Sequence, residues 1–156
     1  MVKRIIKKII KAEVKISTIS DTGKGLFALV DINKDSIIAE YKGKLRSPGQ
    51  QLLSRRSNIY FNDEYILECP DTDLASFAND CINYPKERRK VYEALMSNEP
   101  FYKKHDAANL NATIKLNDRL HRAFLIATCD IKVGQEIFCH YGFSYWFDTE
   151  IRRGFL

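Results

Sequence analysis

Cysteines at metal-binding spacing are missing from this sequence. The chain contains four cysteines, Cys69, Cys81, Cys129 and Cys139, and they form no C-x-x-C or C-x-C motif. Structural zinc sites usually draw their ligands from such closely spaced pairs. The sequence therefore argues against a metal site formed by this chain alone.

Long apolar runs are missing too. A helix that crosses a bilayer needs about 20 consecutive apolar residues. The longest apolar runs here span only a few residues, and lysines interrupt the N-terminal isoleucines. We therefore expect no signal peptide and no membrane span, and a soluble protein in a reducing compartment.

The apolar residues that are present suffice for one domain over residues 1–156. Hydrophobic residues make up 45% of the chain, enough to bury a core at this length. The formal net charge of +5 favours an acidic neighbour such as chromatin or nucleic acid. Sequence-specific nucleic-acid binding is not expected, because no helix-turn-helix, zinc-finger or aromatic RNA-binding motif is present.

Residues 1–12 form a basic N-terminal element. Four isoleucines recur there at helical spacing, and five lysine and arginine residues lie between them. Two interpretations stay open. The element is either an amphipathic helix or strand that covers the core, or a basic clamp against DNA or an acidic protein face.

Short strands dominate the rest of the prediction. Apolar patterns predict strands at 14–19 and 36–43, and hairpins at 58–68 and 113–127. Residues 20–25 are predicted as a turn, whose glycines allow positive φ and close approach of a ligand. Helices are predicted only at 48–56 and 85–97.

The C-terminal part of the chain contains the most informative segment. Ile137–Tyr141 is predicted to be a short strand, and Gly142 ends it. Tyr141 then lies at a strand end, where a side chain projects into a cleft. This is a typical position for a catalytic or ligand-binding residue.

Three segments together resemble the SET domain, the protein-lysine methyltransferase family. Residues 127–142 read A-T-C-D-I-K-V-G-Q-E-I-F-C-H-Y-G, similar to the family's A-x-x-D-I-x-x-G-E-E-L-T-x-x-Y-G. Residues 77–81 read F-A-N-D-C against F-I-N-H-S, and residues 23–28 read G-K-G-L-F-A against G-x-G-[LVI]-F-A. The resemblance implies a mainly β fold with short helices, a β-clip of several small sheets with a knot-like crossing of the C-terminal segment.

The same resemblance implies S-adenosylmethionine as cofactor. Carried over to this chain, main-chain groups of Lys24, Gly25 and Leu26 lie around the methionine part of the cofactor. The Asn79 side chain holds its amino group, and the Asp80 backbone meets the adenine.

Catalysis is assigned by the resemblance to Tyr141, whose hydroxyl orients the substrate amine and interacts with the methyl or sulfonium group. Tyr60, assigned with Tyr141 to the catalytic site, and Phe143 are expected to wall the channel for the substrate lysine. For Tyr60 the alternative is a hairpin aromatic that packs on its cross-strand neighbour. Trp146 is expected to pack near the adenine, since a large flat side chain stacks on a purine.

Two positions of the channel control the number of methyl groups added in this family, and here they are Ile114 and Cys139. Neither residue has a phenol that holds a water. The resemblance therefore favours a roomy site and higher methylation.

The sequence also departs from the family pattern. Asp80 stands where histidine is usual and Ser76 where arginine is usual, and residues 84–108 form a helical insertion, a lid or docking helix or a solvated excursion. No cysteine-rich zinc segment follows Gly142. The ending resembles that of small stand-alone SET proteins, including a viral type.

These features together predict a methyltransferase acting on a protein lysine, with a histone tail or nucleosome as the default substrate. We expect non-specific contact with DNA and no membrane partner, while a homo-oligomer stays open. The expected location is the nucleus, the host nucleus for a viral or secreted microbial protein, and otherwise the cytoplasm. A catalytically inactive SET-fold module that binds peptide or chromatin is the alternative, and a basic nucleic-acid-binding β protein is a third hypothesis.

Overall fold

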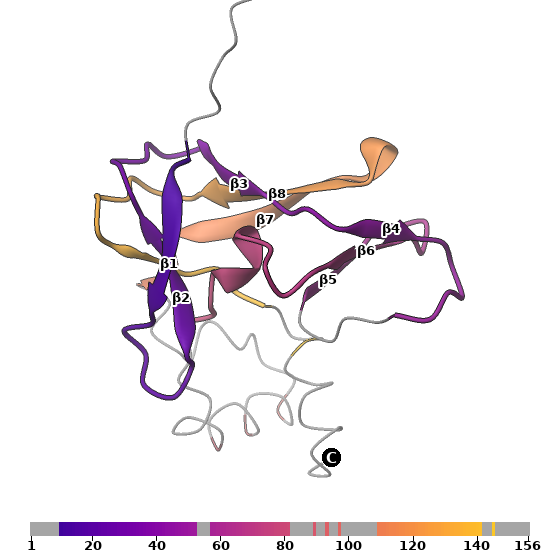
Figure 1. Ribbon diagram of the computed structural model, residues 1–156, viewed down its shortest axis with the longest axis horizontal. Coiled ribbons are helices and arrows are strands. Elements are labelled where there is room, and N and C mark those ends of the chain that lie inside the picture. Colours follow the sequence, from indigo (N-terminus) through magenta and orange to yellow (C-terminus); the bar gives the residue numbers. More distant parts are fainter. Residues whose placement is uncertain are drawn as a thin grey trace, which may run out of the picture.

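The computed structural model describes residues 10–52, 57–81 and 109–141, together with Arg89, Glu93, Ser97 and Tyr145. Within these residues the fold consists of three small antiparallel sheets and two 3-10 turns (Figure 1). The strands are β1 (Ala12–Ile16), β2 (Lys24–Ala28), β3 (Ile37–Glu40), β4 (Lys44–Arg46), β5 (Ser57–Tyr60), β6 (Ile66–Cys69), β7 (Ala112–Asn117), β8 (Arg122–Ala127) and β9 (Glu136–Ile137). The turns are η1 (Ala75–Phe77) and η3 (Asp118–Leu120). The expected fold class, mainly β with several small sheets, is confirmed.

The first sheet has the order β1-β2-β9, so the glycine-containing strand β2 lies in its middle. Leu26 faces Val14 of β1 on one side and Ile137 of β9 on the other. The turn that joins β1 to β2 is shifted from its predicted place, because β1 ends at Ile16 and Gly25 is part of β2. The pairing with β1 extends the ladder to Lys24, which lies opposite Ile16.

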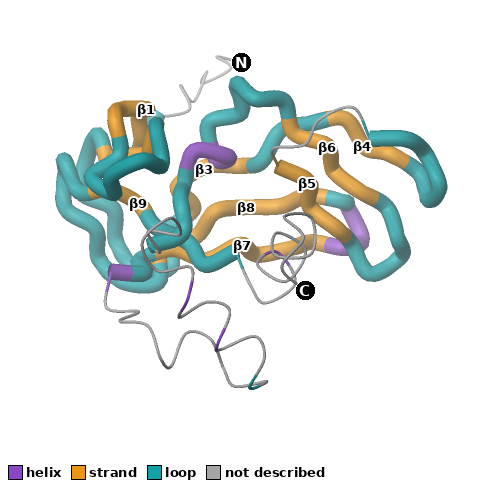
Figure 2. The backbone as a smooth tube through the Cα atoms, turned by 90° about the horizontal axis from the view of Figure 1, so that it is seen from below, coloured by secondary structure: helices purple, strands orange, loops and turns teal. Residues whose placement is uncertain are grey.

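The other two sheets, β3-β8-β7 and β4-β6-β5, lie side by side (Figure 2). Each contains one of the two predicted hairpins, β5–β6 and β7–β8, with continuous antiparallel register. Both hairpin predictions are therefore confirmed. A register shift between Ile37 and Ala39 bends β3 at the edge of its sheet.

The helix predicted at 48–56 is wrong for the part that the structure describes. Residues 48–52 form a turn followed by extended chain. The Gln50 amide donates to the Ser47 carbonyl at 3.2 Å, and the Gln50 side chain accepts the Ser47 amide at 2.9 Å. Gly49 supplies the positive φ of 80° that this turn requires. Residues 53–56 lie outside the described residues.

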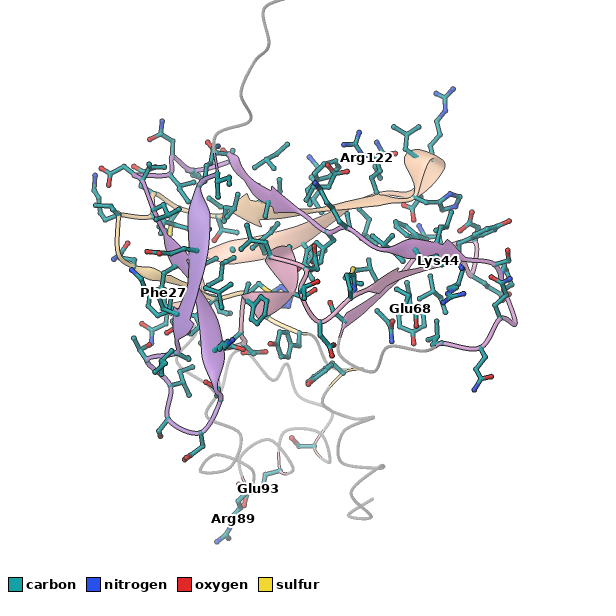
Figure 3. All side chains as sticks on the ribbon, in the orientation of Figure 1. Phe27, Lys44, Glu68, Arg89, Glu93 and Arg122 are labelled. Atoms are coloured by element: carbon teal, nitrogen blue, oxygen red, sulfur yellow. The ribbon has the colours of Figure 1, made fainter. Side chains whose placement is uncertain are left out.

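The predicted helix at 85–97 lies mostly outside the described residues, as does the N-terminal element up to residue 9. Arg89 and Glu93 are helical, and the Arg89 Nε lies 2.9 Å from the Glu93 carboxylate (Figure 3). The Ser97 amide donates to the Glu93 carbonyl at 3.1 Å, which is the i to i+4 bond of an α-helix. The role of the 84–108 insertion stays a prediction.

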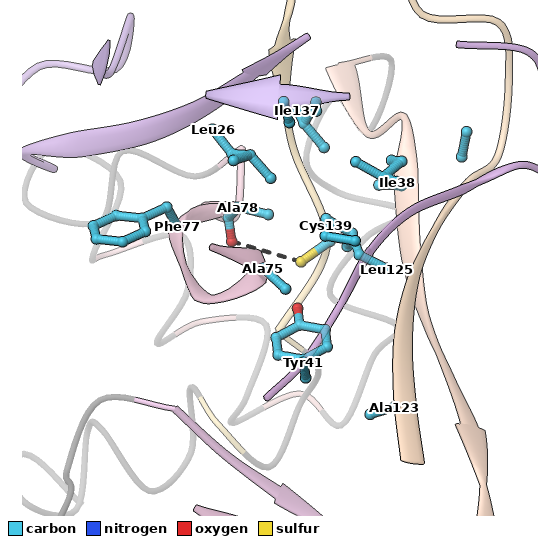
Figure 4. Close-up of a cluster of buried hydrophobic side chains, with 14 of the residues drawn as sticks. Leu26, Ile38, Tyr41, Ala75, Phe77, Ala78, Ala123, Leu125, Ile137 and Cys139 are labelled. Carbon is cyan, nitrogen blue, oxygen red and sulfur yellow. Dashed lines mark hydrogen bonds between the residues drawn. The ribbon is translucent and has the colours of Figure 1, made fainter. Parts of the chain in front are cut away.

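The core connects the sheets around η1. Leu26, Leu125 and Ile137 are completely buried, and each comes from a different strand of the first two sheets (Figure 4). Ala75 and Ala78 are small enough to let η1 approach these side chains closely. Residues at this depth stabilise the fold by about 2–5 kcal/mol each relative to alanine. The core thereby fixes the chain segments that carry the candidate site.

Candidate functional site

The chain that follows β9 runs between two other segments. Phe138 makes a parallel bridge to Asn79, and Cys139 makes a parallel bridge to Ala112. The Cys139 amide donates to the Asn79 carbonyl at 2.9 Å, while the Ala112 amide donates to the Phe138 carbonyl at 3.0 Å. Residues far apart in the sequence are therefore joined along both edges of this segment. The knot-like crossing of the chain end stays a prediction, because residues 142–144 and 146–156 lie outside the described part.

The Asn111 side chain strengthens this junction. Its Nδ2 donates to the Glu136 carbonyl and its Oδ1 accepts the Phe138 amide, both at 2.9 Å. One side chain thus satisfies two main-chain groups of the strand that leads to Tyr141.

The carboxylate of Glu136 ties the β1–β2 turn to the same junction. It is buried and accepts hydrogen bonds from the Ser17 hydroxyl at 2.6 Å and from the Thr18 amide at 2.7 Å. A Cβ at Gly25 would lie 2.0 Å from Glu136 Oε1, so the backbone passes directly over the carboxylate. Only glycine fits at position 25 without displacing the Glu136 carboxylate, which accepts the hydrogen bonds of the turn.

A cavity of about 300 Å³ opens beside Tyr141. Its walls come from the β1–β2 turn, the end of β3, β5, the segment after η1, β7 and the chain end. The lining residues are Thr22, Tyr41, Ser57, Asn58, Ile59, Ser76, Ala78, Asn79, Ile114, Tyr141 and Tyr145. The structure thus brings three predicted site residues, Asn79, Ile114 and Tyr141, to one cavity.

Tyr141 lies with its ring mostly enclosed at this cavity. Its hydroxyl is 3.4 Å from the Ala78 carbonyl, and the Tyr145 ring packs edge-on at 4.6 Å between centroids. Burial is the main cause that raises the pKa of Tyr141 above its ordinary value of 10.0, and Cys139 and Tyr145 add to the effect. The phenol therefore stays protonated at neutral pH and works as a hydrogen-bonding group, not as a phenolate base.

Below Tyr141, Cys139 and Tyr41 form a second, deeper layer. The Cys139 thiol is 3.7 Å from the Ala78 carbonyl, and the Tyr41 hydroxyl lies beside it (Figure 4). Burial raises the pKa of Cys139 to about 12 and raises that of Tyr41 well above its ordinary value of 10.0. Sequence reasoning missed this place for Tyr41, although the tyrosine after Glu40, at the end of an apolar strand, was a signal for it.

The residues predicted to bind the cofactor come from β2 and from the segment after η1. The Asn79 Nδ2 donates to the Lys24 carbonyl at 2.9 Å, which joins the segment after η1 to the start of β2. Leu26 is completely buried in the middle strand, so its side chain belongs to the core. Asp80 is buried as well, and its carboxylate accepts the Tyr141 amide at 2.9 Å.

These groups fit S-adenosylmethionine in chemical character. The cofactor carries a positive sulfonium and an ammonium group, which carbonyl, amide and carboxylate oxygens complement. The carbonyls of Lys24 and Ala78 supply such oxygens beside Asn79 and Tyr141. The buried Asp80 carboxylate does not line the cavity and holds the Tyr141 amide instead.

Of the predicted residues that the structure describes, those that do not line the cavity are Lys24, Gly25, Leu26, Tyr60, Asp80 and Cys139. Tyr60, at the end of β5, is 63% exposed and is not among the lining residues. The three residues before it, Ser57, Asn58 and the buried Ile59, line the cavity instead. Phe143 and Trp146 lie outside the described residues, so their predicted roles stay predictions.

Ligand groups for a metal ion do not gather in the ranges that the structure describes, where no three histidine, cysteine or acidic side chains form a cluster. The described ranges also contain no helix of the length and apolar character that a bilayer crossing requires.

Comparisons with known proteins agree with this geometry. The family model of the SET domain matches residues 23–142. Among solved structures, the methyltransferase domain of human PR domain-containing protein 2 is similar, with a TM-score of 0.53 and 11% sequence identity, over 86% of this chain and 78% of that chain. At this identity the likeness concerns the fold. No curated protein matches the sequence. Because the family model spans most of the chain, the protein belongs to the SET domain family, whose members are generally lysine methyltransferases that use S-adenosylmethionine.

Proposed function

We propose that the protein transfers a methyl group from S-adenosylmethionine to a lysine side chain of a protein. The observation that carries the proposal is that Asn79 and Tyr141 line the same cavity. They come from distant parts of the chain, since Asp80, which follows Asn79, lies 61 positions before Tyr141. A protonated phenol and a set of carbonyl oxygens at one place suit the alignment of an amine with a cationic methyl donor.

The cofactor would supply the methyl group as an electrophile bonded to a positive sulfur. The residues of this chain have two tasks. Tyr41, Ile59 and Ile114 offer aromatic and apolar surface along which the stem of a lysine fits. A free lysine has a pKa of about 10.4, and an apolar wall lowers it by disfavouring the charged form, so that the amine enters the reaction without its proton.

Tyr141 would orient that amine. Its phenol stays protonated, so the oxygen accepts from the amine or contacts the electron-poor methyl group while its own proton points toward the Ala78 carbonyl, 3.4 Å away. Alignment of the reacting atoms is the main contribution that such a site makes to the rate of a displacement.

A histone tail or a nucleosome is the substrate that we propose first. Histones are the commonest substrates of the family, and the net charge of +5 favours the acidic DNA of a nucleosome as neighbour over an isolated basic tail. A nuclear location follows from this substrate. The test is transfer of a radiolabelled methyl group to core histones and to nucleosomes, with the modified lysine identified by mass spectrometry. Absence of transfer to either, with transfer to other proteins of a lysate, would exclude the histone substrate.

The structure changes the expectation for the number of methyl groups that the protein adds to a lysine. The expectation of higher methylation depended on the absence of a phenol at positions 114 and 139. The structure places the Tyr41 hydroxyl beside Cys139, so a phenol is present near this position after all. We propose that Tyr41 limits the room in the channel, and mass spectrometry of the product of a Tyr41→Phe variant tests it by the proportion of higher methylated lysine.

The alternative is a SET-fold module that binds peptide or chromatin without turnover. It is favoured by Asp80 and Ser76, which replace the usual histidine and arginine. Isothermal titration with S-adenosylmethionine separates the two functions. Cofactor binding at micromolar concentration supports the enzyme, and absence of binding supports the module.

A further inference from the structure

The side chain of Asp80 has an unusual position next to the candidate catalytic residue. It is only 2% exposed, and its Oδ2 accepts the backbone amide of Tyr141 at 2.9 Å. In regular parallel pairing, the amide two residues after Cys139 would donate to the backbone of Cys81, because Cys139 already donates to Asn79 at 2.9 Å. The Asp80 carboxylate takes the place of that acceptor.

This replacement changes the course of the chain at Tyr141. Cys139 is held in the ladder between Asn79 and Ala112, whereas Tyr141 is attached through a side chain. The phenol is then directed back along the partner segment, where its hydroxyl meets the Ala78 carbonyl. A hydrogen bond to a carboxylate is also stronger and shorter than one to a neutral carbonyl.

We propose that Asp80 is a positioning residue, which sets the place of the Tyr141 phenol by holding its backbone. The proposal rests on the proposed function for its effect on the rate. It deepens that function, because it gives a task to the residue that most clearly separates this chain from the family pattern.

Three variants test the proposal. Asp80→Ala removes the acceptor, and Asp80→Asn keeps an oxygen at the same place without the charge. Glu68→Gln is the matched control, because Glu68 is a buried carboxylate that pairs with Arg46 at 2.6 Å in the β4–β6–β5 sheet and does not line the cavity (Figure 3).

Steady-state kinetics are expected to separate the variants. Asp80→Ala lowers kcat by about 10-fold to 100-fold, since a small displacement of a reacting group has an effect of this size, while both KM values stay within about twofold. Asp80→Asn retains most of kcat, and Glu68→Gln keeps it unchanged. The proposal is overturned by an unchanged kcat in Asp80→Ala, or by an equal loss of kcat in Glu68→Gln.

A second measurement keeps the result independent of turnover. Hydrogen exchange of the Tyr141 amide, followed by NMR, is slow in the wild-type protein, slow in Asp80→Asn and fast in Asp80→Ala if the carboxylate holds it. Fast exchange in the wild type excludes the bond. If Asp80→Ala does not fold, the comparison of Asp80→Asn with the wild type decides, and fast exchange in that variant overturns the proposal. A wild-type protein that transfers no methyl group refutes the proposed function alone, because the exchange measurement still tests the position of Tyr141.

Discussion

Two joints connect distant parts of this molecule, and they are built differently. The joint at Tyr141 is largely buried and consists of the hydrogen bonds of the Asn111 side chain, of the main chain, and of the Asp80 carboxylate, which accepts the Tyr141 amide. The other lies at the tips of the β5–β6 and β7–β8 hairpins, where His121 Nε2 is 2.6 Å from the half-exposed carboxylate of Asp63. The His121 ring also packs on Tyr65 at 4.7 Å.

The two joints differ in how strongly the loss of one hydrogen-bonding partner affects the fold. A buried bond loses its water competitor, so removal of one partner leaves an unsatisfied polar group that destabilises the fold. An exposed ion pair is screened by solvent and contributes little. We therefore expect the first joint to set geometry and activity, and the second to respond to pH with a small effect on stability.

The largest effect is expected for Tyr141→Phe. Loss of the hydroxyl removes the group that orients the amine, and kcat falls by about 100-fold or more, the size expected when the reacting atoms are no longer aligned. Melting temperature and affinity for S-adenosylmethionine stay near those of the wild type. Tyr65→Phe, at the hairpin joint, is the control and keeps full activity. Full activity of Tyr141→Phe on every substrate would remove Tyr141 as the catalytic residue.

Next in size is the loss of stability in Asn111→Ala. The Glu136 carbonyl and the Phe138 amide both lose their partner, and the free energy of unfolding falls by about 2–4 kcal/mol. Asn117→Ala is the matched control, since Asn117 accepts only the Leu120 amide in the exposed turn η3, and it costs about 0.5–1 kcal/mol. Urea denaturation measures both. Equal losses would contradict the distinction between the joints.

The reactivity of the buried and exposed cysteine thiols gives a further test. Burial raises the pKa values of Cys69 and Cys139 to about 12, so their thiols stay protonated and inaccessible. Brief treatment of the folded protein with iodoacetamide near pH 8 is expected to label the exposed Cys129 and to leave these two unmodified. Peptide mass spectrometry identifies the labelled positions, and rapid labelling of Cys139 would show that the layer below Tyr141 is open.

The smallest effect is expected at the hairpin joint. The hydrogen bond from His121 lowers the pKa of Asp63 below its ordinary value of 3.8, so the carboxylate is the favoured form in the folded protein. A lowered pKa means that this contribution to stability is present above the unfolded pKa and is lost as the pH falls through the folded pKa.

An Asp63→Asn variant tests that sign. Its melting temperature is expected to lie slightly below that of the wild type at about pH 6, and the difference is expected to shrink as the pH falls below the unfolded pKa of about 3.9. A difference that grows on acidification would have the wrong sign and would exclude the pair as its source.

The sequence predicted those parts of the molecule that depend on local patterns. Alternating apolar residues were sufficient for both hairpins, and the spacing of the family motif was sufficient to place Asn79 and Tyr141 together. The place of Tyr41 depends on how β3 ends below Cys139, which is a contact between distant segments that no local pattern encodes. Likewise, the bond from the Tyr141 amide to Asp80 exists only after the two segments pair.

The failed helix at 48–56 has a local cause that competed with the apolar pattern. Ser47 and Gln50 bond to each other across a turn whose Gly49 has positive φ, and such chemistry favours a turn over a helix. Tyr60 shows a different limit, because the cavity borders β5 at Ser57, Asn58 and Ile59 and leaves the next residue of the same strand exposed.

The bond between Ser17 and Glu136 spans 119 positions of the chain. During synthesis, the turn between β1 and β2 therefore lacks its carboxylate partner until Glu136 has left the ribosome. Non-local contacts of this kind form late and slowly. A nascent chain stalled before residue 136 would consequently contain both hairpins but lack the carboxylate that holds the turn next to Lys24.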